Sequence, residues 1–279
     1  LMAFPALSNL DDVPRFTARL NDHGVRERPF DDLPAPGVRR VIAVGESSTF
    51  GTGLAIGERF TERLQEALDA RHPGCCEVLN AGRMGTTTPS AVRFVKEEVL
   101  AWKPAVLIWD TMANDLRDPQ RDQRLDLRPE RLAEYEAGLR ELSTLCKEAG
   151  VQIVFWANSI AHEGDEDPLA AHRAVMRQVA VDGGHGYVDL DALYAAQPAT
   201  APEMKAFLGE PNWTHFHDVL GPGKLPLSRL ALHVDWVHPN RFGSLRLAAG
   251  LLAPLERALG LDPGVAKALG LDPGGMRAA

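Results

Sequence analysis

Cysteine is scarce in this chain of 279 residues, which contains only three. Cys75, Cys76 and Cys146 have no metal-binding spacing, and the adjacent pair could close only a strained ring. We therefore expect free, buried thiols, with neither a disulfide framework nor a cysteine metal site.

Long apolar runs and a surplus of positive charge are also missing. No apolar stretch approaches the roughly 20 residues that a helix needs to cross a bilayer, so we expect no transmembrane segment. The net charge of -8 argues against nucleic acid as a partner, because phosphate contacts need a concentrated basic surface. Residues 1–10 lack the basic flank and long apolar core of a secretion signal. Since the chain opens with Leu-Met, the sequence leaves open whether a leader or anchor precedes it. It therefore leaves the localisation open as well.

Segments typical of strands and helices alternate along the central part of the chain. The strands are short and almost continuously apolar, whereas the helices carry apolar residues at spacings of three and four. We expect strands at 38–44, 76–80, 105–110, 152–158 and 187–190, and helices at 58–71, 90–101, 129–149, 168–181 and 244–259. Such alternation predicts an α/β fold with a parallel sheet covered on both faces.

Three flanking or inserted segments interrupt this pattern. Residues 1–37 form a Pro- and Asp-rich arm that we expect to wrap the surface of a single domain at 38–260. Residues 197–230 are rich in Pro, Gly, aromatic and His residues, and their length is more typical of a lid or site wall than of a simple connection. Residues 261–279 are interpreted as a C-terminal tail.

A serine, a histidine and a carboxylate stand at places where they could meet. Ser47 follows the first strand in the motif Gly-Glu-Ser-Ser-Thr-Phe-Gly, at the edge where parallel sheets build their sites. Asp235 and His238 lie in Asp-Trp-Val-His-Pro, just before the last helix. A serine hydroxyl needs a base to become a nucleophile, and imidazole, with an ordinary pKa of about 6.5, suits that task. The sequence therefore predicts Ser47 as nucleophile, His238 as base and Asp235 as the group that orients the imidazole.

Two further strand ends offer donors for a developing oxyanion. Gly85 lies in residues 80–86 and would let its backbone N–H approach without a side chain in the way. Asn114 follows the third strand and would supply an amide N–H. The backbone N–H of Ser47 is the third expected donor.

These four segments, in this order, resemble the four sequence blocks of the SGNH hydrolases, also called the GDSL esterase/lipase family. The resemblance extends from about residue 38 to 259. It implies a three-layer α/β/α sandwich with a five-stranded parallel flavodoxin-like sheet, and no cofactor or metal. It also implies the roles given above to Ser47, Gly85, Asn114, Asp235 and His238.

Two departures from the family pattern concern the geometry of the site. Glu46 stands where the family name records an aspartate, and Met112-Ala113 replaces a glycine-containing lead into Asn-Asp. Neither removes a reacting group, but Glu46 could reach a different backbone partner than aspartate would. Residues 21–26, Asn-Asp-His-Gly-Val-Arg, also resemble a segment of extracytoplasmic, membrane-anchored members, which favours an extracytoplasmic location over a cytoplasmic one.

The expected function is a serine esterase that hydrolyses carboxylic esters, with short acyl or acetyl esters preferred, through an acyl-serine. Its partner would be a small-molecule or glycan ester. Two alternatives stay open: an SGNH-type O-acetyltransferase acting on a carbohydrate or other hydroxyl, and a non-catalytic binding protein on the same fold. The oligomeric state is undetermined.

The insertion, together with Trp236 just after it, contains two features with competing interpretations. We interpret His215, His217 and Asp218 as part of a solvated loop rather than as a metal site. Side chains so close together in the sequence rarely bind one ion without a ligand from another element. Anchoring to the core is favoured over substrate contact for the aromatic side chains Trp213, Phe216 and Trp236.

Overall fold

The fold is a five-stranded parallel sheet between two layers of helices. The computed structural model describes residues 18–116, 128–159, 169–200, 202–203, 206, 232–233 and 237–261. The strands are β1 (Arg39–Gly45), β2 (Cys76–Asn80), β3 (Val106–Asp110), β4 (Gln152–Ala157) and β5 (Gly186–Asp189). Their order, β2-β1-β3-β4-β5, with every pair parallel, is the flavodoxin-like order that was predicted.

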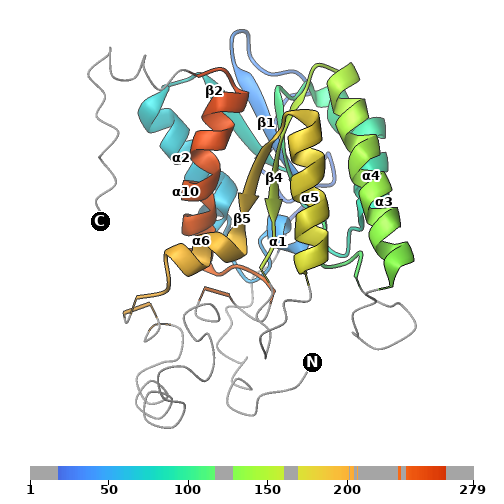
Figure 1. Cartoon of the computed structure of the whole chain (residues 1–279). Coiled ribbons are helices and arrows are strands. Elements are labelled where there is room, and N and C mark those ends of the chain that lie inside the picture. The colour runs from blue at the N-terminus through green and yellow to red at the C-terminus, as the bar shows by residue number, and fades with distance from the viewer. Residues whose placement is uncertain are drawn as a thin grey trace.

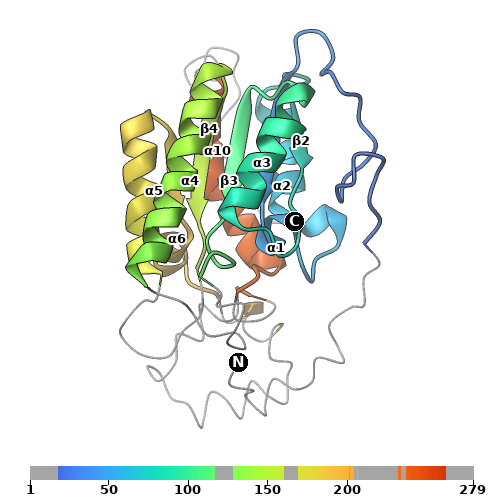
Figure 2. The same cartoon turned by 90° about the vertical axis from the view of Figure 1, so that its right-hand side faces the viewer.

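Helices cover both faces of this sheet. They are α1 (Ser47–Phe50), α2 (Phe60–Arg71), α3 (Thr88–Glu97), α4 (Pro129–Glu148), α5 (Ala170–Gly183), α6 (Leu190–Ala196) and α10 (Arg241–Ala258), with short 3₁₀ turns η3 (Ile56–Glu58) and η4 (Val99–Trp102). Helices α2 and α10 lie on one face, and α3, α4 and α5 lie on the other (Figures 1 and 2). The predicted three-layer sandwich is confirmed.

The alternation of side chains along the strands explains the two layers. In β1, Val41 and Ala43 belong to the cluster that packs against α2 and α10, whereas Ile42 and Val44 belong to the cluster under α3, α4 and α5. All four are at most 1% exposed. Because successive residues of a strand face opposite sides, a strand that is apolar throughout needs cover on both.

Capping residues set helix starts that differ from the expected ones. Helix α3 begins at Thr88 rather than at 90, because the Thr87 backbone N–H donates to Ser90 Oγ at 2.9 Å in a capping box. Helix α10 begins at Arg241 rather than at 244, because Asn240 Oδ1 accepts from the N–H groups of Phe242 and Gly243 in the first turn.

Helix α6 was not predicted from the sequence. It follows β5 without a connecting loop, and the Asp189 side chain caps it by accepting from Ala192 N at 3.1 Å. Part of the segment interpreted as the start of the insertion lies directly behind it, at 197–200.

The flanks are described only in part. Arm residues 18–37 run along the β2 edge of the sheet (Figure 2), and Val25 of the arm is 1% exposed within the core. The described residues do not include most of the insertion, the tail from residue 262, or Asp235. The interpretations of His215, His217, Asp218 and the aromatic side chains of that region also concern residues outside the described ranges. Across the described ranges, no helix is both long and apolar enough to cross a membrane.

The three cysteines are free thiols, as predicted. Cys76 and Cys146 are buried, as predicted, but the prediction of burial was wrong for Cys75, which is partly exposed. Burial raises the pKa of Cys76 to about 11 and that of Cys146 to about 12, so both thiols stay protonated near neutral pH.

Candidate active site

Ser47 and His238 form a hydrogen-bonded pair at the carboxyl end of β1. The Nε2 atom of His238 lies 2.7 Å from Ser47 Oγ, although the two residues are 191 positions apart in the sequence. Both side chains are partly exposed, whereas Glu46 and Ser48 beside Ser47 are buried. The fold therefore brings the predicted nucleophile and the predicted base into direct contact with each other. Both side chains are also accessible to solvent.

The turn that carries Ser47 is a single turn of helix, α1. The Ser47 carbonyl accepts from Gly51 N, Thr52 N and Thr52 Oγ1, each at 3.1 Å. Gly51 ends the turn with φ +79°, in the left-handed region that favours glycine. These bonds fix the backbone from which the nucleophile projects.

Two glycines let neighbouring backbones pack directly against this turn. A Cβ atom on Gly82 would lie 2.3 Å from Phe50 N and 2.6 Å from the Thr49 carbonyl carbon. One on Gly45 would lie 2.4 Å from Asp110 O. The loop after β2 therefore contacts the nucleophile turn, and the end of β3 contacts the last residue of β1, at distances that no other residue type permits.

His238 is placed by a buried anchor, His233, beside the carboxyl end of β4. His233 is fully buried, its Nε2 lies 3.1 Å from Ser159 O, and its backbone pairs with Pro239. Asn240 N also donates to Leu232 O at 2.8 Å. The strand-like pairing on both sides of residues 234–236 fixes the base at the start of α10. Because Asp235 lies outside the described residues, its orienting role stays a prediction.

Gly85 lies in an exposed turn of the loop after β2. Its φ is +71°, and no atom stands within 4 Å of where a Cβ would be. The backbone conformation, rather than crowding, is therefore what favours glycine here. Its function as an oxyanion donor stays a prediction.

The side-chain amide of Asn114 is held by two acceptors. Nδ2 donates to Glu46 Oε2 at 2.7 Å and to Thr86 O at 3.1 Å. An amide nitrogen carries two hydrogens, so these bonds engage both. To donate to an oxyanion, as predicted, Asn114 must exchange one of these acceptors for the substrate oxygen.

Glu46 is the residue that departs from the family motif, and it reaches the loop after β3. Besides the Asn114 side chain, its carboxylate accepts from the backbone N–H groups of Asn114 at 3.0 Å and Ala113 at 3.2 Å. Burial raises the pKa of Glu46 to about 7, and the negative charge of Asp115 adds to the rise, while the backbone donors oppose it. Glu46 thus joins the nucleophile turn to the Asn114 loop.

Two aspartates, buried Asp110 and partly exposed Asp115, complete a group of carboxyls around Glu46. Asp115 accepts from Thr88 N and Thr88 Oγ1 at 2.8 to 3.1 Å, and burial raises its pKa to about 6. Burial and the neighbouring Glu46 raise the pKa of Asp110 well above its ordinary value. Asp110 Oδ1 has no hydrogen-bond partner in the described part of the chain.

Asn158 is a supporting residue that the sequence analysis did not single out. It follows β4, and its Nδ2 donates to Ser48 Oγ at 2.8 Å, next to the nucleophile. The only signal for it was a polar residue at the carboxyl end of a predicted strand, the position that also identified Asn114.

A cavity of about 190 Å³ lies behind the loop after β2, and Arg83, Thr86, Ser90 and Phe94 contribute to its lining. Neither Ser47 nor His238 lines it. It is therefore not the pocket from which an acyl group would be attacked. No group of three or more His, Cys, Asp or Glu side chains within the described residues is arranged to hold a metal ion.

A parallel α/β sheet that places a serine hydroxyl against an imidazole at its carboxyl edge has the architecture of a serine hydrolase. The GDSL-like lipase/acylhydrolase family matches residues 43–244, more than two thirds of the chain. The chain belongs to this family. By class it is therefore an acylhydrolase.

Solved structures with the same fold include several esterases. LAE5, an alpha/beta hydrolase enzyme from the metagenome of Lake Arreo, Spain, is 20% identical over 80% of this chain and 95% of its own, with a TM-score of 0.56. A catalytic mutant of Axe2, an acetylxylan esterase from Geobacillus stearothermophilus, is 22% identical over 80% and 95%, with a TM-score of 0.54. TesA is 16% identical over 79% and 99%, with a TM-score of 0.55. A search among curated proteins found no similar sequence.

Proposed function

We propose that this protein is a serine esterase that hydrolyses carboxylic esters through an acyl-Ser47 intermediate. The observation that carries the proposal is the 2.7 Å contact between Ser47 Oγ and His238 Nε2. In the first half-reaction Ser47 Oγ bonds to the carbonyl carbon while its proton passes to Nε2. Nε2 then returns that proton to the departing alcohol as the ester C–O bond breaks.

Water completes the cycle in the second half-reaction. Its proton passes to His238 Nε2 as its oxygen attacks the acyl carbon, and the proton returns to Ser47 Oγ as the acid leaves. In each step the negative oxygen would be stabilised by the N–H groups of Ser47, Gly85 and Asn114. Asp235 would accept from Nδ1 of the imidazole and stabilise its cationic form.

Acetyl or other short acyl esters of glycans are the substrates that we propose. The support comes from relatives, because two of the proteins with this fold are described as acetyl xylan esterases. In Axe2, replacements of a serine, an aspartate and a histidine are described as catalytic mutants, and that aspartate and histidine are three positions apart, as Asp235 and His238 are here.

The test compares two serines that each contact a histidine. Ser143 Oγ lies 2.9 Å from His185 Nε2, between α4 and β5, but without the proposed oxyanion donors. Ser47→Ala is expected to abolish turnover of p-nitrophenyl acetate with folding intact, and Ser143→Ala to leave turnover unchanged. Equal turnover by Ser47→Ala and wild type would refute the nucleophile assignment.

Two alternatives use the same residues and are separated by product analysis. In an O-acetyltransferase, a hydroxyl acceptor replaces water in the second half-reaction, so acetylated acceptor would exceed free acetate at dilute acceptor. In a binding protein on this fold, the wild type would turn over no ester in a broad panel. Release of free acetate that depends on Ser47 supports the esterase over both.

A further inference from the structure

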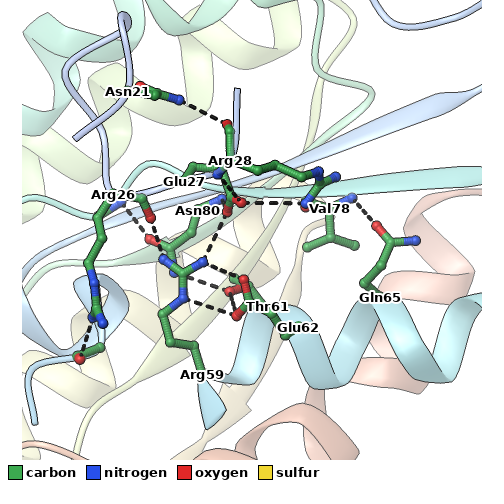
Figure 3. Close-up of polar contacts among 12 residues, drawn as sticks. Asn21, Arg26, Glu27, Arg28, Arg59, Thr61, Glu62, Gln65, Val78 and Asn80 are labelled. Atoms are coloured by element: carbon green, nitrogen blue, oxygen red, sulfur yellow. Dashed lines mark hydrogen bonds and ion pairs between the residues drawn. The ribbon is translucent and has the colours of Figure 1, made fainter. Parts of the chain in front are cut away.

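A buried cluster of charged side chains joins the N-terminal arm to the segments that carry the proposed active site (Figure 3). Arg26 and Glu27 of the arm are 2% and 7% exposed, and Arg59, which precedes α2, is fully buried. Glu62 of α2 completes the cluster with a side chain that is 19% exposed. The two positive charges of the arginines balance the two negative charges of the glutamates. Burial of charged side chains is tolerated when they are paired in this way.

Arg26 binds the carbonyl end of the nucleophile turn. Its guanidinium donates to Phe50 O at 3.1 Å, Gly51 O at 2.8 Å and Leu54 O at 2.6 Å. It also lies 5.1 Å from the centre of the Phe50 ring. Phe50 is the last residue of the turn that begins with Ser47, so Arg26 fixes the end of α1 opposite to the nucleophile.

Glu27 binds the end of β2, from which the Gly85 loop departs. Its Oε2 accepts from Asn80 N at 2.9 Å. The Asn80 side chain in turn donates to Thr49 O at 2.7 Å and accepts from Gly82 N at 3.0 Å. Through Asn80, the arm therefore holds the Gly85 loop and the nucleophile turn against each other.

Arg59 ties these two contacts together. Its guanidinium donates to Arg26 O, to the Glu62 carboxylate and to Glu27 Oε2, the last at 3.2 Å. Its aliphatic stem passes over Gly51, where a Cβ would lie 2.7 Å from Arg59 Cγ. The arm is thus fixed to α1 from outside residues 43–244, the part of the chain that matches the family.

We propose that arm residues 21–28 are a positioning element of the active site, in which Arg26 and Glu27 set the nucleophile turn relative to the Gly85 loop. These residues act through the backbone and touch no reacting atom. A misplacement of about 1 Å in a catalytic site can reduce the rate about a hundredfold, so loss of this support is expected to affect kcat. The kinetic consequence rests on the proposed function.

Arg40 offers a matched control for Arg26. It is 1% exposed and also binds two carbonyls, Asp32 O at 2.8 Å and Trp102 O at 2.9 Å, together with the Glu77 carboxylate at 2.8 Å. It is the second residue of β1, at the end of the strand remote from Ser47. Removing either arginine breaks a buried network of charged groups, but only Arg26 binds the nucleophile turn directly. Arg40 connects to Glu27 only indirectly, through Glu77 and Arg28.

The experiment measures Tm and ester kinetics of Arg26→Ala and Arg40→Ala, with assays well below both values of Tm. Both variants are expected to have a lower Tm. Only Arg26→Ala is expected to lose kcat, about a hundredfold, with KM little changed. If the two variants lose the same fraction of kcat, the arm has only a stabilising role and the positioning inference is overturned.

A milder pair covers the case in which the alanine variants do not fold. Lysine keeps the charge but lacks the fork of donors that binds several carbonyls. Amide hydrogen exchange in residues 47–54 is expected to be about tenfold faster in Arg26→Lys than in wild type, and unchanged in Arg40→Lys. Exchange needs no substrate, so it decides the inference even if the wild type proves inactive on esters. Unchanged exchange in Arg26→Lys would contradict positioning while leaving the esterase proposal intact.

Discussion

The Oε2 atom of Glu46 accepts hydrogen bonds from both the side-chain amide and the backbone N–H of Asn114, at 2.7 and 3.0 Å. This contact joins the residue before the proposed nucleophile to a proposed oxyanion donor in the loop after β3. Glutamate is one methylene longer than the aspartate of the family motif, and in this chain the longer side chain spans to the loop after β3. The position of Asn114 therefore depends on Glu46.

Replacement of Glu46 by glutamine should weaken catalysis through Asn114. Glutamine has one acceptor oxygen in place of two, so at least one N–H of Ala113 or Asn114 loses its partner. We expect kcat to fall about tenfold with KM nearly constant, since a hydrogen bond to a charged group is worth about 1.5–3 kcal/mol.

A double-mutant cycle isolates that effect. Asn114→Ala alone should lower kcat by about 10²–10³, as loss of an oxyanion donor does. In the Asn114→Ala background, Glu46→Gln should change kcat much less than in wild type. Additive losses would show that Glu46 acts independently of Asn114.

The pH dependence of stability should also report on Glu46. Its pKa in the folded state, about 7, is above the ordinary value of 4.5, so the folded protein binds more protons than the unfolded chain between these values. The stabilising contribution is present below pH 4.5 and is lost as pH rises through about 7. We expect the free energy of unfolding, measured with urea between pH 5 and 8, to fall less steeply in Glu46→Gln. An equally steep fall in that variant would assign the effect to other groups.

Asp110 and Asp115 should respond differently to the same change. The pKa of Asp110 is raised well above its ordinary value, and asparagine is a neutral group of similar shape, so Asp110→Asn should cost little stability at pH 7. Asp115 accepts from Thr88, the first residue of α3, where a negative charge is also favourable. Asp115→Asn should therefore lose about 1–2 kcal/mol more than Asp110→Asn in chemical denaturation. The reverse order would contradict a raised pKa of Asp110.

Gly82→Ala should disrupt the contact between the loop after β2 and the nucleophile turn. The added methyl would meet Phe50 N at 2.3 Å, and both partners are backbone that cannot rotate away. We expect a loss of about 1–3 kcal/mol in stability and a lower kcat.

Gly57→Ala is the matched control, because no atom lies within 4 Å of the added methyl. Its stability should stay within about 1 kcal/mol of wild type, and its kcat should not change. A tolerated alanine at position 82 would mean that the two backbones can separate without loss of function.

The layers of the fold were readable from the sequence because they depend on local patterns. The apolar run of β1 and the spacing of apolar residues in α4 predicted a strand and a helix, and alternation of such segments predicted a parallel sheet. Helix starts were less well predicted, since Thr87 and Asn240 act through single side-chain bonds that leave little trace in periodicity. The same holds for α6, which one Asp189 contact begins.

For the site, the sequence by itself determined the chemistry on offer: a hydroxyl, an imidazole and an amide at strand ends, in the order of a known family. Tertiary structure alone decided that Ser47 meets His238, that Glu46 reaches Asn114 and that Arg26 of the arm holds the carbonyl end of α1. These pairs are 191, 68 and 25 positions apart. No local pattern encodes such contacts, because they arise only when the strand order of the sheet brings separate loops to one edge.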